Sequence, residues 1–249
     1  MTSGARALLC ALMGLLAVEA SAQLANAEPN ISGTWERLGG LGGGADSPYV
    51  PPREGPPPLK PQYRADYEAR RAAARAADER GEPIATHNTF CIPDGMPGMM
   101  AGPFPFEILQ SPGQVTIVQE AYNQIRRIYL NKPQLPLEEI EPGFYGRSVG
   151  QWRDGELHVE TLGIKERVRF RDVPHSPAMR ITERIRLVAP DVLWDEITIH
   201  DPEVLEEPWQ VTFAYRRLPD YEILEYVCEN NREYADEAGG TRLRIGGPE

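Results

Sequence analysis

Apolar and polar residues alternate with a period of two through most of the chain beyond residue 114, a pattern typical of β-strands that bury one face. Strands are expected over residues 115–120, 124–130, 148–152, 156–162, 167–170, 179–188, 192–199, 209–218 and 221–228. Asp154-Gly155 is a turn dipeptide between two of these segments. About eight to ten strands with short connections favour a mainly β fold, an antiparallel barrel or a sandwich.

Three stretches before these strands break the alternation. Residues 38–62 are rich in Gly and Pro and predict a long surface loop. Residues 62–80 are rich in Ala, Arg and Glu, which predicts a helix on the outside of the body. Residues 82–113 carry repeated prolines and glycines, so we expect an irregular passage there. Its Phe and Met residues make it unusually apolar for a loop, and it is expected to cover either the core or a ligand mouth.

The first 27 residues predict a cleavable export signal. Residues 7–18 form an apolar run of signal-peptide length that is too short to span a bilayer comfortably. Small residues follow in the spacing of a cleavage site, with cleavage expected after residue 22 or 27. No lipid-attachment motif precedes Cys10, so no membrane anchor is expected. The expected location is therefore periplasmic or secreted.

The mature chain is long enough for one domain with a sizeable core, which we place at residues 28–234, with 235–249 as a flexible tail. It keeps two cysteines, Cys91 and Cys228. An even pair in an oxidising compartment favours a disulfide, worth about 4–5 kcal/mol on the chain-entropy model. The alternative is a catalytic Cys with a His partner.

Composition excludes several classes of function. The net charge of −11 argues against binding to nucleic acid or to an anionic membrane. The sequence has no Gly-x-Ser-x-Gly elbow, phosphate-binding glycine loop or dinucleotide fingerprint, so no nucleotide cofactor is expected. Without a His-x-His or His-Glu-x-x-His spacing, no metal site is expected either.

Two carboxylates occupy positions that the alternation assigns to apolar faces. Glu183 shares a face with Ile181 and Ile185, and Asp195 lies on the apolar face of the next strand. Buried carboxylates are costly unless they are paired or hydrogen-bonded. Either Glu183 or Glu120 forms a structural ion pair with an arginine such as Arg126, Arg127 or Arg217, or the carboxylates are acid–base groups with raised pKa values in a ligand cavity.

Other candidates come from the same strands and their loops. His175 lies in a loop at the expected barrel rim, and His200 ends a strand on the same face as Trp194. With Tyr145, these histidines and the two carboxylates form the candidate catalytic set: Glu183, His175, Asp195, Tyr145 and His200. The candidate ligand-binding set is Trp209, Phe213, Tyr215, Trp194 and Arg217. The strand pattern predicts that His158 faces solvent, and His87 lies in the apolar loop.

Several motifs extend over most of the mature chain: ISGTW (31–35), CIPDGMPGMM (91–100), EILQSPGQVTIVQE (107–120), PHSPAMRITERIRL (174–187), ITIHDP (197–202) and YVCENN (226–231). In these segments the chain resembles a poorly characterised family of exported bacterial proteins with a lipocalin-like β-barrel. In lipocalins the Trp of the Gly-x-Trp motif closes the barrel base, so the resemblance implies a structural role for Trp35. In family members a His often occupies the positions of Arg147 and Arg180, and a Glu that of His200, where this chain departs.

Two functions fit these observations. The first is an exported enzyme that acts on an apolar, aromatic small molecule in a barrel cavity by cofactor-independent acid–base chemistry, of lyase or isomerase type rather than hydrolytic. The second is a non-catalytic periplasmic carrier of a hydrophobic ligand. The surroundings of Glu183 and Asp195 discriminate between the two. Carboxylates tied to arginine and sealed from any cavity favour the carrier, whereas a His and a carboxylate that converge in a cavity favour the enzyme.

Overall fold

The computed structural model describes residues 28–39, 43–82, 84, 86–228, 233–235 and 241–243 of the 249-residue chain. The expected signal segment, residues 1–27, lies outside these ranges, as does most of the expected tail at 235–249.

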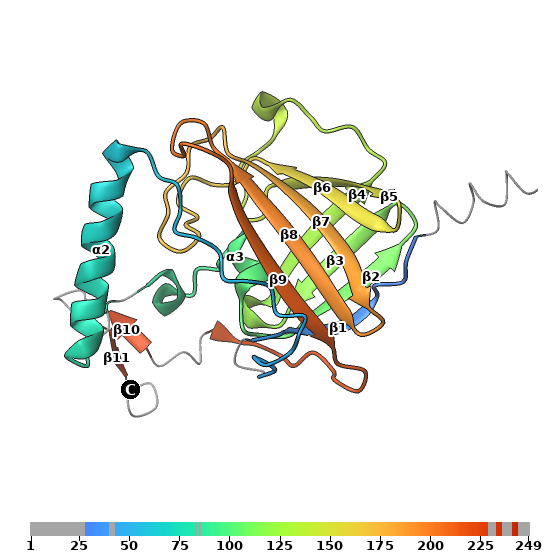
Figure 1. Cartoon of the computed structure of the whole chain (residues 1–249), viewed down its shortest axis with the longest axis horizontal. Helices are drawn as coiled ribbons and strands as arrows, with labels where there is room; N and C mark the ends of the chain where they lie inside the picture. The colour runs from blue at the N-terminus through green and yellow to red at the C-terminus, as the bar shows by residue number, and fades with distance from the viewer. Residues whose placement is uncertain are drawn as a thin grey trace, which may run out of the picture.

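Within the described ranges, nine strands form a closed barrel in the order of the sequence (Figure 1). They are β1 (Gly33–Arg37), β2 (Phe106–Ser111), β3 (Gln114–Gln119), β4 (Gln124–Leu130), β5 (Arg147–Arg153), β6 (Glu156–Leu162), β7 (Arg180–Ala189), β8 (Val192–His200) and β9 (Trp209–Arg217). The barrel closes because β1 pairs with both β2 and β9. Every pairing is antiparallel except that of β4 with β5, which is parallel. The expected mainly β, lipocalin-like barrel is confirmed, with this one parallel exception.

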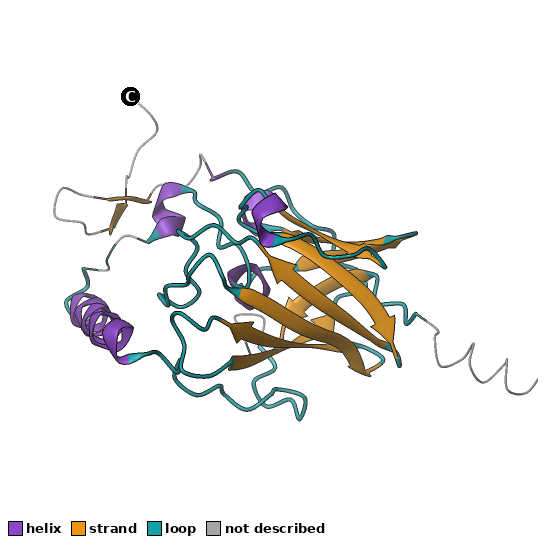
Figure 2. Cartoon of the chain, turned by 90° about the horizontal axis from the view of Figure 1, so that it is seen from above, coloured by secondary structure: helices purple, strands orange, loops and turns teal. Residues whose placement is uncertain are grey.

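The remaining elements are short apart from one helix. They are α2 (Pro61–Glu79), α3 (Gly98–Ala101), the 3-10 turns η1 (His87–Phe90), η2 (Ala121–Asn123) and η3 (Leu137–Glu139), and the hairpin of β10 (Glu233–Ala235) with β11 (Thr241–Leu243). The view from above shows that most helices and loops gather at one end of the barrel, with α2 away from the strands (Figure 2). No helix among the described residues is long and apolar enough to cross a membrane.

Three segment predictions were wrong. Strand β2 lies inside the stretch 82–113, where the flanking prolines Pro105 and Pro112 concealed its alternation. Residues 167–170 form a loop that ends in a tight turn rather than a strand. Residues 221–228 contain no strand, although their pattern alternates. The Glu120 carboxylate instead holds this segment, accepting hydrogen bonds from the Tyr221 hydroxyl at 2.7 Å and the Leu224 N–H at 3.0 Å.

The alternation of β7, β8 and β9 places their apolar faces inside the barrel. Ile181, Ile185, Ile197, Val211 and Phe213 are at most 2% exposed and belong to one core cluster. The outward faces carry the charged and hydroxyl side chains. Glu183 and Asp195 therefore point into the barrel, and His158 and His200 point away from it.

The Gly-x-Trp motif closes the base of the barrel. Trp35 is fully buried, its indole N–H donates to the Ile31 carbonyl at 3.0 Å, and the Arg217 guanidinium lies 4.2 Å from the indole ring centre. A Cβ at Gly33 would lie 2.9 Å from an Arg217 nitrogen, and the φ of +121° at this residue also favours glycine. The motif thus seats the Trp–Arg stack that seals this end.

Candidate functional site

A polar cluster lies at the centre of the barrel. The Arg126 guanidinium on β4 donates to both carboxylate oxygens of Glu183 on β7, one of them at 2.8 Å. It also donates to the hydroxyls of Thr161 at 3.0 Å and Ser148 at 3.2 Å. The two charged side chains are 1% and 0% exposed. The structure therefore places Glu183 in a sealed, bidentate ion pair, the structural alternative that the sequence left open.

Asp195 lies beside this pair without a donor of its own. It is fully buried, and neither carboxyl oxygen receives a hydrogen bond from a donor among the described residues. Burial, and then the negative charge of Glu183, raise the pKa of Asp195 well above its ordinary 3.8, and the charge of Arg126 opposes them. The raised pKa favours the protonated form of Asp195, whose hydroxyl can donate to Glu183.

This assignment predicts how stability depends on pH. The pKa of Asp195 is higher in the folded protein than in the unfolded chain, so this group contributes its full stabilisation of the fold below about pH 3.8. That contribution is lost as the pH rises toward the folded-state pKa. Asp195→Asn keeps a donor toward Glu183 but does not titrate. Its stability relative to the wild type is therefore expected to rise with pH, by up to about 1.4 kcal/mol per pH unit above pH 4. Urea unfolding of both proteins from pH 4 to 8 measures the difference, and a constant difference would contradict a protonated Asp195.

Of the other predicted catalytic residues, His175 is already hydrogen-bonded and Tyr145 is held neutral. The ring nitrogens of buried His175 contact the backbone carbonyls of Ser176 at 2.9 Å and Lys165 at 3.0 Å, so neither is left to take a proton from a ligand. Beside it lies a cavity of about 20 Å³, also lined by Trp209, which has room for about one water molecule. Burial, and then the charge of Asp94, raise the pKa of Tyr145 to about 12, which keeps its phenol neutral.

The remaining predicted residues do not share one cavity. Phe213 and Tyr215 point into the packed barrel, where the Tyr215 hydroxyl donates to the Met100 carbonyl at 2.7 Å. Trp194 and His200 lie on the outer face. The Trp194 indole N–H donates to the Tyr49 carbonyl at 2.9 Å. Burial, and then the charge of Arg180, lower the pKa of His200. Because the predicted set is spread over the interior, the outer face and the base, it does not form a site.

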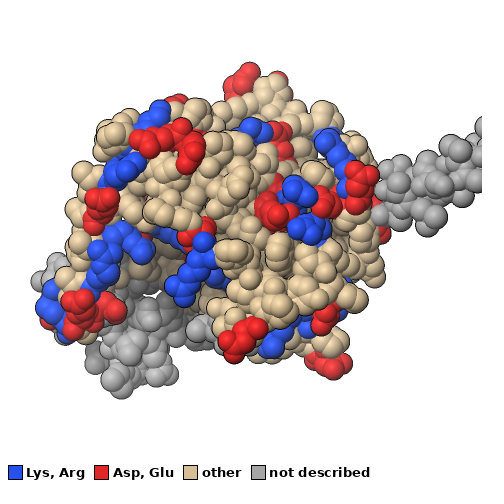
Figure 3. Space-filling view, viewed as in Figure 1, with Lys and Arg blue, Asp and Glu red and all other residues tan. Residues whose placement is uncertain are grey.

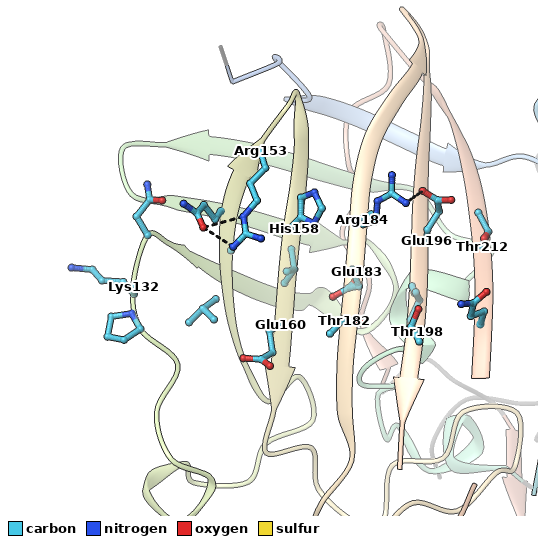
Figure 4. Close-up of a pocket in the computed structure, with 18 residues that line it drawn as sticks. Lys132, Arg153, His158, Glu160, Thr182, Glu183, Arg184, Glu196, Thr198 and Thr212 are labelled. Carbon is cyan, nitrogen blue, oxygen red and sulfur yellow. Dashed lines mark hydrogen bonds and ion pairs between the residues drawn. The ribbon is translucent and has the colours of Figure 1, made fainter. Parts of the chain in front are cut away.

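A hollow of about 850 Å³ lies on the outer faces of β5 to β9 (Figure 4). Two of the charged side chains that line it, Arg184 and Glu196, are in ion pairs. Arg184 donates two hydrogen bonds of 3.0 Å to Glu156, and Glu196 lies 3.1 Å from Arg186 and 3.9 Å from Arg184. Threonines such as Thr182 and Thr198, which are paired across β7 and β8, line the same face (Figure 4). This hollow is a polar sheet face in which Arg184 already has carboxylate partners. Lys132 and Arg153 have none within ion-pair distance among the described residues, and the lining residues include no Phe, Tyr or Trp.

A second hollow, of about 840 Å³, opens where the loops meet at one end of the barrel. We call it the mouth cleft and define it by the side chains of Arg37, His87, Asp94, Phe104, Tyr122, Arg169, Phe170, Arg171 and Tyr226. They come from β1, from the apolar passage 82–113, from η2 and from the two segments wrongly predicted as strands, except that Arg171 follows the first of these two segments. In the space-filling view, Lys and Arg side chains gather beside the space between α2 and the barrel (Figure 3).

Three guanidinium groups give the mouth cleft its charge. Arg171 is paired with Glu54, whereas Arg37 and Arg169 have no carboxylate within ion-pair distance among the described residues. Arg37 instead donates to the Ala101 carbonyl and lies over the Phe213 ring, 4.9 Å from its centre. Burial, and then the charge of Arg37, lower the pKa of Arg171. A bound anion would relieve this repulsion between like charges.

Aromatic side chains also line the mouth cleft. The rings of Tyr122 and Tyr226 lie 4.9 Å apart, and Phe104 meets Tyr226 edge-on at 6.2 Å. The disulfide between Cys91 and Cys228, with Cα atoms 5.7 Å apart, fixes the segment that carries Tyr226 to the loop after η1. The expected disulfide is thus present, and it links two walls of the cleft.

The mouth cleft also holds a His–carboxylate pair. The Nε2 atom of His87, at the start of η1, lies 2.7 Å from the Asp94 carboxylate. Asp94 has no arginine within ion-pair distance among the described residues. A carboxylate that orients an imidazole is the arrangement of a general base. Here a His and a carboxylate converge in a cavity, as the enzyme hypothesis requires, but they are not the residues that the sequence suggested.

Two side chains of the mouth cleft stand on left-handed backbone. Tyr122 has a φ of 60° and Arg171 a φ of 53°. Asp172 follows with a φ of 65°, and the Val173 N–H closes a tight turn onto the Phe170 carbonyl at 3.0 Å. Such conformations cost about 1–3 kcal/mol each and concentrate at functional sites. The turn holds Arg171 at the wall of the cleft.

Sequence reasoning located this region but not its residues. It predicted that the apolar passage 82–113 covers a core or a ligand mouth, yet it selected none of Arg37, Arg169, Arg171, His87 and Asp94. No group of three or more His, Cys, Asp or Glu side chains in the described part of the chain is placed to hold a metal ion. No protein-family model matches the chain, and no curated protein is significantly similar to it.

Proposed function

We propose that this protein binds a small organic anion with an aromatic body in the mouth cleft. The observation that carries the proposal is the pair of guanidinium groups, Arg37 and Arg169, that lack a carboxylate partner beside an aromatic wall. Arginine pairs with carboxylate and phosphate groups through two parallel hydrogen bonds, and aromatic rings pack on Tyr and Phe. A cleft of about 840 Å³ is within the range of small-molecule sites, roughly 300–1,000 Å³.

The barrel interior is the weaker place for a ligand. The ion pair of Arg126 and Glu183 is sealed, and Phe106, Phe213 and Tyr215 fill the space near it. Glu183 is tied to arginine as the carrier hypothesis requires, and Asp195 is buried beside it without an arginine partner of its own in the described part of the chain. Binding at the mouth, rather than inside the barrel, is therefore the function that the geometry supports best.

An enzyme is the second candidate, because the pair of His87 and Asp94 lies in the same cleft. In this account the arginines bind the anionic group of the substrate. His87 transfers a proton to or from the carbon next to that group, which is acid–base chemistry without a nucleotide cofactor. A His87→Ala variant separates the two functions. Loss of turnover with binding retained supports the enzyme, and the absence of turnover from wild-type protein with every ligand that binds contradicts it.

We also propose that the protein works outside the cytoplasm. The composition of residues 1–27 supports export, and the disulfide of Cys91 with Cys228 suits an oxidising compartment. Membership of a family of exported bacterial proteins is part of the same proposal, supported by the barrel and by the sequence motifs. Fractionation of the native host tests it, and an unprocessed N-terminus in the cytoplasm would contradict it.

The anion preference gives a direct binding prediction. Wild-type protein is expected to bind 2-naphthoate at least tenfold more tightly than 2-naphthamide, which has the same rings without the charge. Arg169→Gln is expected to weaken naphthoate binding about tenfold and to leave amide binding unchanged. Isothermal titration measures both.

The matched control is Arg153→Gln, because Arg153 is exposed on the outer hollow and, among the described residues, its side chain donates only to Gln151. It removes the same charge from the protein at a distance from the mouth cleft. If both variants weaken binding equally, the effect is one of net charge and the site assignment fails. Equal affinity of the wild type for the acid and the amide would contradict the anion preference itself.

A further inference from the structure

A third hollow, of about 490 Å³, lies between α2 and the loops at the barrel end. We call it the helix chamber. Its apolar lining consists of Ala73 and Ala74 of α2 together with Ile84, Ile92, Phe144 and Val168. Ile84 is 46% exposed, so its side chain is available to a molecule in the chamber.

The helix chamber adjoins the mouth cleft. The two hollows share the lining residues Thr86, His87, Asp94 and Arg169. A molecule with its charged group near Arg37 and Arg169 can therefore continue past the pair of His87 and Asp94 into the space beneath α2. Charged side chains of the chamber such as Arg70 and Arg167 have contacts of their own, to Asp66 at 2.9 Å and over the Phe144 ring at 4.6 Å.

The composition of α2 keeps this space open. Alanines stand where the helix faces the chamber, and a larger side chain at Ala74 would enter it. The helix is held to the core chiefly at its start, where Tyr63 and Tyr67 pack against the hydrophobic cluster. Beyond them most of its residues are exposed, apart from buried Ala77.

We propose that the helix chamber binds an apolar tail, so that the ligand of this protein is an amphipathic anion longer than a single aromatic acid. This inference rests on the proposed function, because the mouth cleft must hold the anionic head. The shared side chains of His87 and Asp94 then lie beside the join between head and tail, which is where proton chemistry would act if the protein is an enzyme.

The test compares two acids that differ only in the tail. By isothermal titration, wild-type protein is expected to bind 6-hexyl-2-naphthoate at least tenfold more tightly than 2-naphthoate, because burial of each methylene group is favourable. Ala74→Trp is expected to abolish this gain and to leave 2-naphthoate binding unchanged. The control is Ala72→Trp, which adds the same side chain at an exposed position of α2 outside the chamber lining.

Each outcome decides a different claim. If neither acid binds, the proposed function and this inference both fail. If 2-naphthoate binds and the hexyl acid gains nothing, or gains equally in both Trp variants, the inference fails and the proposed function stands. Circular dichroism of the two variants confirms that α2 still forms.

Discussion

Glu183→Gln is expected to destabilise the folded protein by about 3–5 kcal/mol, because it leaves the Arg126 charge buried without a counter-ion. The hydroxyls of Ser148 and Thr161 stay in contact with the guanidinium, but they cannot neutralise it. Urea denaturation at pH 7 measures the loss, which is a large share of the 5–15 kcal/mol that holds a typical domain together.

The matched control is Glu156→Gln on the outer face. Glu156 also pairs with an arginine, but Arg184 is exposed to water, so the loss is expected to stay below about 1 kcal/mol. If the two variants lose the same stability, the pair in the barrel is not the sealed ion pair that the geometry describes. A catalytic role for Glu183 would instead show as lost turnover with stability unchanged.

Cys91→Ser with Cys228→Ser is expected to cost about 4–5 kcal/mol, because the disulfide closes a loop of 137 residues in the unfolded chain. The same change frees the segment of Tyr226 and Val227 from the loop after η1. We therefore also expect 2-naphthoate to bind more weakly, since the aromatic wall must then be ordered when the ligand binds.

Thermal unfolding and titration of the double variant measure these two effects separately. Wild-type protein treated with a reducing agent is the control, because it has the same open loop without a substitution. A variant with unchanged stability and unchanged naphthoate binding would show that the disulfide supports neither the fold nor the mouth cleft.

The strand positions and the buried carboxylates were predictable because both follow from the alternation of side chains. The period of two placed Glu183 and Asp195 on the apolar faces, and the need to compensate a buried charge predicted an arginine partner. The sequence did not choose among Arg126, Arg127 and Arg217, and the structure selects Arg126. The same rule failed for residues 221–228, whose alternating side chains lie in a segment held by Glu120 rather than in the sheet. It also missed β2, because flanking prolines made that stretch look irregular.

The mouth cleft could not be predicted residue by residue. Arg37 comes from the first strand, and Arg169 and Arg171 come from a loop about 130 residues later. Tyr226 comes from the segment that follows β9. Periodicity carries no information on which loops meet at a barrel end, because loop contacts depend on the three-dimensional closure of the sheet. In the sequence, only the apolar character of residues 82–113 indicated a loop that covers the core or a ligand mouth.

The central claim, that the mouth cleft is the ligand site, is tested most directly by a crystal structure of the protein with 6-bromo-2-naphthoate and measurement of the anomalous signal of bromine. The account predicts a single strong bromine peak in the mouth cleft or at its join with the helix chamber, with the carboxylate against Arg37 and Arg169. A peak inside the barrel beside Arg126, or in the outer hollow over β5 to β9, would contradict it.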